Sequence, residues 1–385
     1  MGELSYLEKL LDGGEIEWVP LDSIFDIFAG GDVPKDALSN IQTEEYNIPI
    51  LSNGIGNNSL YGWTNKGKIN SPSLTISARG TIGWTSYRDT PFFPIVRLIV
   101  LTPKKELNLK YAYYFMKMIE GDYKTPKTGI PQLTKPMLKD IRLPVPCPST
   151  PRKSLAIQSE IVRILDTFTA LTAELIAELT ARKRQYNYYR DQLLSFKEGE
   201  VEWVTLSVLA ENHDSKRKPI TSGLRDAGNI PYYGASGIVD YVKDYIFDGD
   251  FLLVSEDGAN LLARNTPIAF SISGKAWVNN HAHVLKFDTY AERRYVEYYL
   301  NSIDLTTYIS GAAQPKLNKK NLESIRIPNP SPKEKERVVS ILDNFDALTN
   351  SITEGLPREI ALRQQQYEYY RDLLFSFPKP DEVAN

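Results

Sequence analysis

Cysteine is almost absent from this chain: Cys147 is the only one among 385 residues. No disulfide can therefore form within the chain, which excludes a disulfide-stabilised secreted domain and fits a reducing compartment. No apolar run approaches the roughly 18 residues that span a bilayer. The first residues, MGELSYLEKLLDGG, lack the basic stretch and apolar core of a signal peptide. These absences predict a soluble, cytoplasmic protein.

Motifs that carry catalysis are also lacking. No GxxxxGK[ST] phosphate loop and no Asn-Pro-Pro-Tyr-type methylation motif is present, and Asn329-Pro330-Ser331-Pro332 is only a proline-rich segment. The glycines in Phe28-Ala29-Gly30-Gly31-Asp32 favour a turn over a cofactor loop. His281 and His283 have no nearby cysteine or acid in the sequence, so a metal site is disfavoured. We therefore expect no catalytic residues, no metal ligands and no cofactor bound by this chain.

Excess positive charge is lacking too, since the net charge is −3. The distribution is uneven, however: residues 60–143 hold fourteen Lys and Arg against five Asp and Glu, whereas residues 1–59 hold two against eleven. The basic segment 60–143 could meet a nucleic acid, and the acidic segment 1–59 could meet a protein partner. Uneven charge without function is the alternative interpretation.

What is present is an internal repeat. Glu17-Trp18-Val19 recurs as Glu202-Trp203-Val204, an offset of 185 residues, and Tyr188-Tyr189-Arg190-Asp191 recurs as Tyr369-Tyr370-Arg371-Asp372. Repeats of this kind indicate two copies of one structural unit. Each copy comprises a globular part of about 130 residues followed by a helix, and the globular parts have diverged except at their edges.

The globular parts are expected to be mixed α/β, with short strands bounded by Gly, Asn and Pro. We predict strands at 49–51, 73–77, 95–101, 230–233, 251–254 and 283–287, and short helices at 109–119 and 291–301. Each part ends in a proline-rich exit, at 143–148 and 327–332, which predicts a domain boundary.

Residues 155–197 contain neither Gly nor Pro, and this absence predicts one long helix. Apolar residues recur at heptad spacing, as at Ile161, Phe168 and Leu175, and the second helix repeats the pattern until Gly355-Leu356-Pro357, which should break or kink it. Two antiparallel coiled-coil helices with internal pseudo-twofold symmetry are therefore predicted. The expected domains are a helix at 1–14, globular domains at 15–150 and 199–332, and coiled-coil segments at 151–198 and 333–385.

Three segments carry a resemblance to a known family. Residues 172–179 form a tandem four-residue repeat, Thr-Ala-Glu-Leu-Ile-Ala-Glu-Leu, and residues 181–196 follow it to Phe196. This region resembles the central conserved region of type I restriction-modification specificity subunits, closest to type IC. Residues 351–377 resemble the distal conserved region, and residues 5–11 resemble the N-terminal one.

The resemblance implies that each globular part reads one half of a bipartite double-stranded DNA target and that the helices set the spacer. It also implies that two methyltransferase subunits dock on the helices and methylate adenine with S-adenosylmethionine, and that restriction subunits join this core to cleave DNA with ATP and Mg. The resemblance places methyltransferase docking at the matching helix residues, namely Tyr186, Tyr188, Tyr189, Arg190, Tyr367, Tyr369, Tyr370 and Arg371. The alternative is that the paired tyrosines belong to the core of the coiled coil.

DNA contacts are expected in loops that combine amide, glycine, aromatic and basic residues. Amide side chains and Arg read the edges of the DNA bases, whereas Lys holds phosphates. In the first globular part the candidates are Asn53, Gly54, Asn57, Asn58, Tyr61, Trp63, Arg79, Gly80, Thr81, Lys124, Lys127, Thr128 and Gln132. In the second they are Tyr233, Gly234, Ser236, Glu256, Asp257, Asn260, Lys275, Trp277, Asn279, Asn280, His281, Gln314 and Lys316.

Two other classes of function stay open. One is a two-domain DNA- or carbohydrate-binding adaptor with a coiled-coil arm and no methyltransferase partner. The other is a nuclease or methyltransferase fused to helices, which the missing motifs make the weakest alternative.

Overall fold

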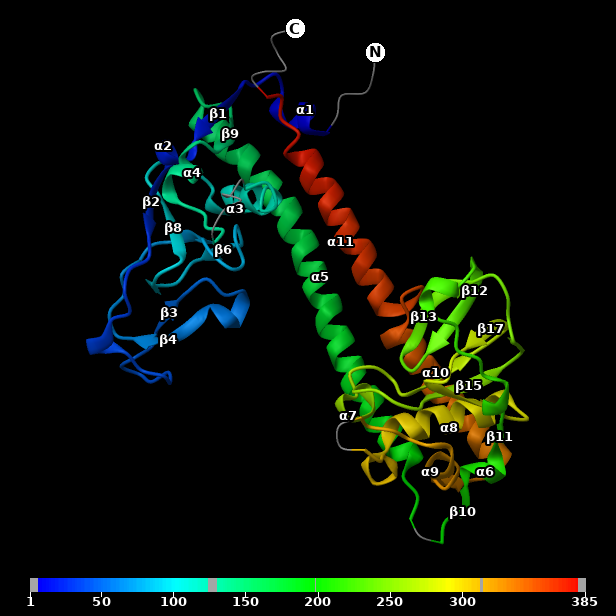
Figure 1. Ribbon diagram of the computed structural model, residues 1–385. Coiled ribbons are helices and arrows are strands. Elements are labelled where there is room, and N and C mark those ends of the chain that lie inside the picture. Colours follow the sequence, from blue (N-terminus) through cyan, green and yellow to red (C-terminus); the bar gives the residue numbers. More distant parts are fainter. Residues whose placement is uncertain (1–5, 124–129, 198, 312–313, 380–385) are drawn as a thin grey trace, which may run out of the picture. The chain divides into compact units, whose positions relative to one another are not determined.

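The computed structural model describes residues 6–123, 130–197, 199–311 and 314–379. The chain forms two compact units: unit 1 contains Met1–Glu174 and Ile360–Asn385, and unit 2 contains Leu175–Glu359. Each has sheets and helices, as the mixed α/β prediction requires (Figure 1).

Within the described residues, unit 1 contains a short first helix, followed by strands and further helical segments. Its strands are β1 (Ile16–Pro20), β2 (Phe25–Ala29), β3 (Ile48–Leu51), β4 (Leu60–Thr64), β5 (Ser73–Ser77), β6 (Thr85–Arg88), β7 (Phe93–Pro94), β8 (Leu98–Pro103) and β9 (Arg142–Pro146). Its helical segments are α1 (Tyr6–Leu11), α2 (Leu21–Ile24), η1 (Lys35–Ala37), η2 (Gly56–Ser59), α3 (Leu109–Met118) and α4 (Lys135–Lys139). Parts of α5 (Pro151–Leu194) and α11 (Gly355–Leu374) complete the unit.

Unit 2 repeats this plan with one additional sheet strand. Its strands are β10 (Glu202–Thr205), β11 (Glu211–Asn212), β12 (Ala227–Gly234), β13 (Gly237–Val242), β14 (Phe247–Asp248), β15 (Phe251–Ser255), β16 (Ala269–Ile272), β17 (Lys275–Val278), β18 (Ala282–Lys286) and β19 (Arg326–Asn329). Its helical segments are α6 (Leu206–Leu209), η3 (Asp214–Lys216), η4 (Ser222–Leu224), α7 (Asn260–Ala263), α8 (Tyr290–Ser302), η5 (Thr306–Tyr308), α9 (Lys319–Glu323) and α10 (Pro332–Asn350).

The sheets of the two units share one topology. The four-stranded order β2-β8-β5-β6 corresponds to β11-β18-β15-β16, and β4-β3-β7 corresponds to β13-β12-β17, to which β14 is added. The sheets β4-β3-β7 and β13-β12-β17-β14 each contain one parallel pair, β3 with β7 and β12 with β17. The repeat seen at the edges of the sequence therefore extends through the diverged interiors.

A helix packs against the sheet β2-β8-β5-β6 in unit 1 and against the sheet β11-β18-β15-β16 in unit 2. Helix α3 contacts β5 and β6, and α8 contacts β15 and β16. Both helices begin at a side-chain cap, Asn108 for α3 and Thr289 for α8, whose oxygens accept bonds from free backbone N–H groups of the first turn. The central strands β5 and β15 are buried at every residue and form the base of each core.

One expectation about the strands differs from the structure. The strand predicted at 95–101 begins only at Leu98, because Arg97 has a φ of 72° that extended backbone does not adopt. The proline-rich exits contain strands of their own: β9 pairs with β1 and β19 with β10. Each pair is a two-stranded sheet, in which both strands are edges and proline is tolerated.

The long helix α5 runs without interruption for 44 residues, which corresponds to about 66 Å. The second helix is interrupted as predicted, since α10 ends at Asn350 and α11 begins at Gly355, whose φ is +74°. In unit 1 the rings of Phe168 and Tyr370 stack at 5.2 Å, and in unit 2 those of Tyr189 and Phe345 stack at 5.7 Å. The coiled-coil pairing of the whole helices stays a prediction.

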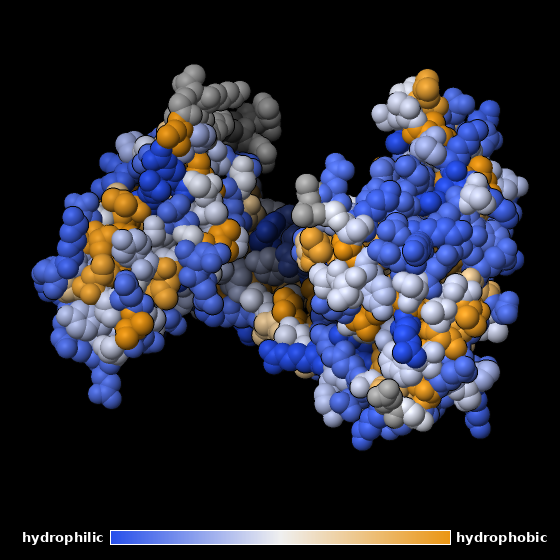
Figure 2. Space-filling view, turned by 60° about the horizontal axis from the view of Figure 1, so that its bottom comes forward, coloured by the Kyte–Doolittle hydropathy of each residue, from blue (hydrophilic) through white to orange (hydrophobic). Residues whose placement is uncertain are grey.

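None of the helices in the described ranges is both long and apolar enough to cross a membrane. On the face drawn in Figure 2, hydrophobic residues lie in small separate patches among hydrophilic ones.

Candidate nucleic-acid interface

In unit 1 several segments meet at the end of strand β5. The backbone N–H of Ala78 donates to the carbonyl of Arg97 at 2.8 Å, and the N–H of Leu133 donates to the carbonyl of Ala78 at 2.8 Å. The hydroxyl of Ser77 donates to the carbonyl of Asn53 at 3.0 Å. We call this set of loop ends the unit 1 platform. It brings together predicted contact residues from three parts of the sequence: Asn53, Arg79, Gly80, Thr81 and Gln132.

Unit 2 contains the same set of bonds at the end of β15. The N–H of Glu256 donates to the carbonyl of His281 at 2.8 Å, and the N–H of Leu317 donates to the carbonyl of Glu256 at 2.7 Å. The hydroxyl of Ser255 donates to the carbonyl of Ala235. This unit 2 platform carries the predicted residues Glu256, Asp257, Asn279, Asn280, His281 and Lys316.

Asn53 holds the unit 1 platform together. Its side-chain amide donates to the carbonyl of Arg79 at 2.6 Å, and its own carbonyl accepts from the hydroxyl of Thr81 at 2.6 Å. Its amide is therefore engaged within the protein. Arg97 is exposed on the same platform, and the sequence prediction missed it because it was assigned to the interior of a strand.

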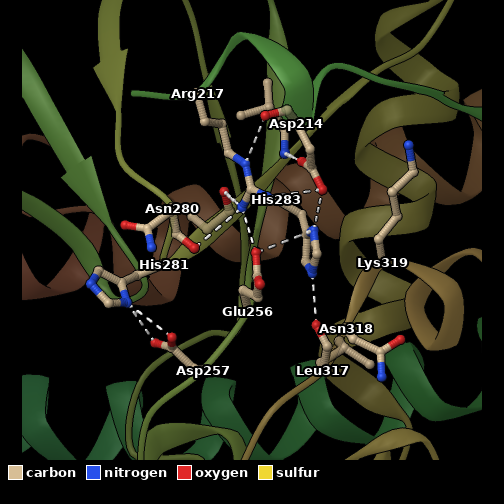
Figure 3. A network of polar contacts seen from close by, with 12 residues as sticks. Asp214, Arg217, Glu256, Asp257, Asn280, His281, His283, Leu317, Asn318 and Lys319 are labelled. Atoms are coloured by element: carbon tan, nitrogen blue, oxygen red, sulfur yellow. Dashed lines mark hydrogen bonds and ion pairs between the residues drawn. The ribbon is translucent and has the colours of Figure 1, made fainter. Parts of the chain in front are cut away.

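A network of charged side chains supports the unit 2 platform (Figure 3). The guanidinium of Arg217 lies 2.5 Å from the carboxylate of Glu256 and 3.3 Å from that of Asp214. Lys316 lies 3.0 Å from the other oxygen of Glu256, and His283 Nδ1 lies 2.6 Å from Asp214. These contacts tie η3, the end of β15, β18 and the segment before α9 to one another.

Two carboxylates and one histidine of this network are of the residue types that bind metal ions. Ligand atoms of Asp214, Glu256 and His283 all lie within 4.8 Å of one another. The cationic Arg217 lies against both carboxylates, and Lys316 against one, so these cations already neutralise the acidic charge. The arrangement favours a structural ion network over a metal site.

Both nitrogens of the buried His283 ring face hydrogen-bond acceptors. Nδ1 lies 2.6 Å from the Asp214 carboxylate and Nε2 lies 2.7 Å from the carbonyl of Leu317. Both contacts are hydrogen bonds when each ring nitrogen carries a proton. Because the carboxylate and the carbonyl come from separate loops, His283 connects η3 to the segment before α9.

The carboxylates of the network stay ionised despite their surroundings. Burial opposes ionisation of Asp214, but His283, the backbone N–H of Val284 and the charge of Arg217 together lower its pKa. Burial likewise opposes ionisation of Glu256, and hydrogen bonds from Arg217 and Lys316 lower its pKa. The stability that these two carboxylates give the folded unit is therefore fully present above the ordinary carboxyl pKa of about 4. It is lost as the pH falls through their lowered pKa values.

Replacing Arg217 with methionine is expected to destabilise unit 2 by about 3–5 kcal/mol, because two buried carboxylates lose their shared cation. Hydrogen exchange of amides in β15 and β18 measures this. The control is Arg182→Met, which removes a surface pair with Glu178 and should cost only about 0.2–1 kcal/mol. Equal exchange in the two variants would show that the network does not support the platform.

An open cleft of about 840 Å³ lies beside the unit 2 platform. It is lined by Asp257, His281, Gln314 and part of α7. The Nδ1 atom of His281 lies 2.9 Å from both oxygens of Asp257, which holds the exposed imidazole in place. Three predicted contact residues therefore converge on one cleft.

The remaining predicted contact residues lie elsewhere or are engaged in the fold. Gly54 follows β3, Asn57 and Asn58 lie in η2, and Tyr61 and Trp63 lie on β4. Tyr233 and Gly234 end β12, Ser236 follows them, Asn260 begins α7, and Lys275 and Trp277 lie on β17. Lys124, Lys127 and Thr128 lie outside the described residues.

The predicted docking residues occur as two matched sets. Tyr188 is 63% exposed and Tyr369 is 64% exposed. Arg190 and Arg371 each lie 5.8 Å from the ring centre of the tyrosine four residues earlier, Tyr186 and Tyr367 respectively. Burial raises the pKa of Tyr186 to about 12, and it raises that of Tyr367 to about 12.

Comparison with known proteins identifies the family. The family described as "Type I restriction modification DNA specificity domain" matches residues 14–181 and 198–362. The specificity subunit of the Escherichia coli type I restriction enzyme EcoR124I/EcoR124II is 39% identical over 100% of both chains. That of the E. coli enzyme EcoprrI is 36% identical over 92% of this chain and 93% of the relative.

Solved structures agree in fold. The S subunit of a type I restriction-modification system from M. genitalium has a TM-score of 0.65 at 17% identity, covering 96% of this chain and 98% of that one. Two family matches within one chain coincide with the two units that repeat the same sheet topology. The chain therefore belongs to the family of type I restriction-modification DNA specificity subunits.

Proposed function

We propose that each unit reads one half of a bipartite DNA target and that the chain docks two methyltransferase subunits. Family membership supports the DNA-specificity role over a carbohydrate-binding adaptor. The observation that carries the proposal is duplication with divergence. Both platforms keep the same backbone bonds, yet their exposed residues differ, with Arg97 in unit 1 where unit 2 has His281.

Divergence at fixed backbone positions is what a bipartite target requires. Side chains that read base edges must differ when the two half-sites differ, whereas the main chain that presents them need not. Matched hydrogen bonds, Tyr114 to Asp166 in unit 1 and Tyr298 to Asp343 in unit 2, instead join each globular part to its helix. Recognition and scaffold are thus separate sets of residues.

The two matched tyrosine sets support two docking sites. Exposed tyrosines are frequent interface anchors, since they bury a large ring and retain a polar hydroxyl. Tyr188 and Tyr369 have almost equal exposure and the same neighbours, namely the edge-on rings of Tyr189 and Tyr370. One partner type can therefore bind at both positions.

The chemistry belongs to the partners in this proposal. The methyltransferase subunits bind S-adenosylmethionine and methylate adenine, and restriction subunits add ATP- and Mg-dependent cleavage. This chain is non-catalytic and positions those subunits on DNA by selecting the sequence and the spacing.

Native mass measurement of the complex reconstituted with the cognate methyltransferase subunit tests the docking. We expect two methyltransferase subunits per chain. Tyr188→Ala and Tyr369→Ala should each weaken one site by about 30-fold or more, the effect of losing an interface anchor, and leave a one-to-one complex.

Tyr241→Ala is the matched control, because Tyr241 is 51% exposed but lies on strand β13 and is not one of the predicted docking residues. It should retain both subunits. A wild-type chain that binds one subunit and cannot add a second would contradict the proposal.

A further inference from the structure

The two platforms correspond residue by residue through their backbone bonds. Ala78 bonds to Arg97 and Leu133 as Glu256 bonds to His281 and Leu317. The same bonds place Arg79 at the position of Asp257. The correspondence rests on these bonds, because Ala78 and Arg97 differ in type from Glu256 and His281, whereas Leu133 and Leu317 are the same residue type.

A second feature marks the same loop in both units. Gly80 has a φ of +74° and Gly258 a φ of +105°, and each follows the corresponding residue, Arg79 or Asp257. A left-handed turn at this point favours glycine. The turn is therefore common to the platforms, while the side chain before it is free to vary.

The exposed side chains on the two platforms differ in chemistry. In unit 1 Arg97 is exposed and Arg79 half-buried, and neither guanidinium has an ion pair with any residue that the structure describes. In unit 2 the corresponding Asp257 and His281 pair with each other beside the open cleft. Unit 1 thus presents two uncompensated cationic forks, and unit 2 an acceptor with an imidazole.

We propose that the platform is the base-reading surface of each unit. Arg97 with Arg79 reads a guanine in one half-site, and His281 with Asp257 reads a base of the other half-site. This inference rests on the proposed function. A guanidinium donates two parallel hydrogen bonds to guanine O6 and N7, which no other base accepts in the same way. Asp257 orients His281 through Nδ1, so the pair presents the Nε2 edge of the ring together with a carboxylate acceptor.

The platform also explains why the bases are read by loop ends rather than by the sheets. The Ala78 and Glu256 bonds fix the loop ends to the buried central strands β5 and β15. A side chain held this close to a rigid strand loses less freedom on binding than one in a free loop. Arg97 has a positive φ and lies directly before β8, so it is not part of that strand.

The test uses the full complex with its cognate methyltransferase subunits and a library of duplexes randomised in both half-sites. The target methylated by the wild type is read first, and a bipartite target with a G·C pair in one half is expected. Then Arg97→Lys, Arg97→Gln and His281→Ala are compared, with Arg152→Gln as a control that removes the same charge from the exposed start of α5.

Lysine distinguishes base reading from phosphate binding, since it keeps the charge but not the two-pronged geometry. We expect both Arg97 variants to lower discrimination at one G·C position by about 5- to 150-fold, the range of one bidentate contact. His281→Ala should change only the other half-site, and Arg152→Gln should match the wild type.

Three results would overturn the inference. The first is a wild-type target with no G·C pair in the half-site that the Arg97 variants affect. The second is an Arg97→Lys variant equal to the wild type while Arg97→Gln weakens binding to all sequences alike, and the third is no change in either half-site. A wild-type complex that methylates no bipartite target would instead refute the proposed function itself.

Discussion

A chain with one extra Thr-Ala-Glu-Leu unit inserted after Leu179 is expected to recognise the same two half-sites with a gap about one base pair longer. The insertion lies within the uninterrupted helix α5. Four residues lengthen a helix by about 6 Å and rotate its end by about 400°, a net turn of about 40°. One base pair rotates DNA by about 35° at 10–10.5 pairs per turn, so the two rotations nearly match.

The length change matches less closely, because one base pair adds only about 3.4 Å. The second helix is already interrupted between Asn350 and Gly355, and this break can absorb the difference. No residue of either platform lies in the inserted segment, which is why the half-sites themselves should not change.

Sequencing of methylated DNA from cells that carry the insertion measures the gap. Glu174→Gln is the control, since it changes an exposed residue of the repeat without changing its length, and its gap should equal that of the wild type. An insertion that leaves the gap unchanged would show that the helices do not set the spacing. Altered half-site bases would show that the repeat contributes to recognition.

The scaffold was predictable from sequence because its residues repeat. The Tyr-Tyr-Arg-Asp segments and the aromatic residues Phe168 and Phe345 recur at matched positions, and the structure gives them matched stacking partners. Heptad spacing and the absence of Gly and Pro were sufficient for α5. Helical patterns of this kind are local, so a single sequence reveals them.

The platforms were only partly predictable because their bonds join distant segments. Glycine-containing loops pointed to Arg79 and Asp257, but nothing in the sequence pairs Ala78 with Leu133, 55 residues later. Arg97 looked like part of a β-branched run, and its positive φ is a product of tertiary contacts. Arg217 was missed because its carboxylate partner Glu256 lies 39 residues away.

A chain whose residues 15–147 come from another member of the family is expected to change one half of its target and keep the other. The two ends of this segment are neighbours, since the N–H of Cys147 donates to the carbonyl of Glu15 at 2.7 Å. The paired strands β1 and β9 close the segment just inside these ends, and α5 begins beyond them at Pro151. The replacement therefore exchanges a globular part without cutting through its core strands.

The graft must preserve the contacts that join the globular part to its helix. The hydroxyl of Tyr114 donates to Asp166 at 2.6 Å, and Lys110 lies 2.7 Å from the same carboxylate. A donor segment that supplies both groups should dock on α5 as the native one does. Unit 2, the tyrosine sets and the helix length are all untouched, so docking and spacing should be retained.

The claim that each unit reads one half-site is tested most directly by single-molecule sequencing of methylated adenines in DNA from cells that carry this chimaera, beside the wild type. We expect one half-site to be replaced by that of the donor, while the other half-site and the gap between them stay the same. A chimaera that changes both half-sites together, or neither while still methylating DNA, would contradict it.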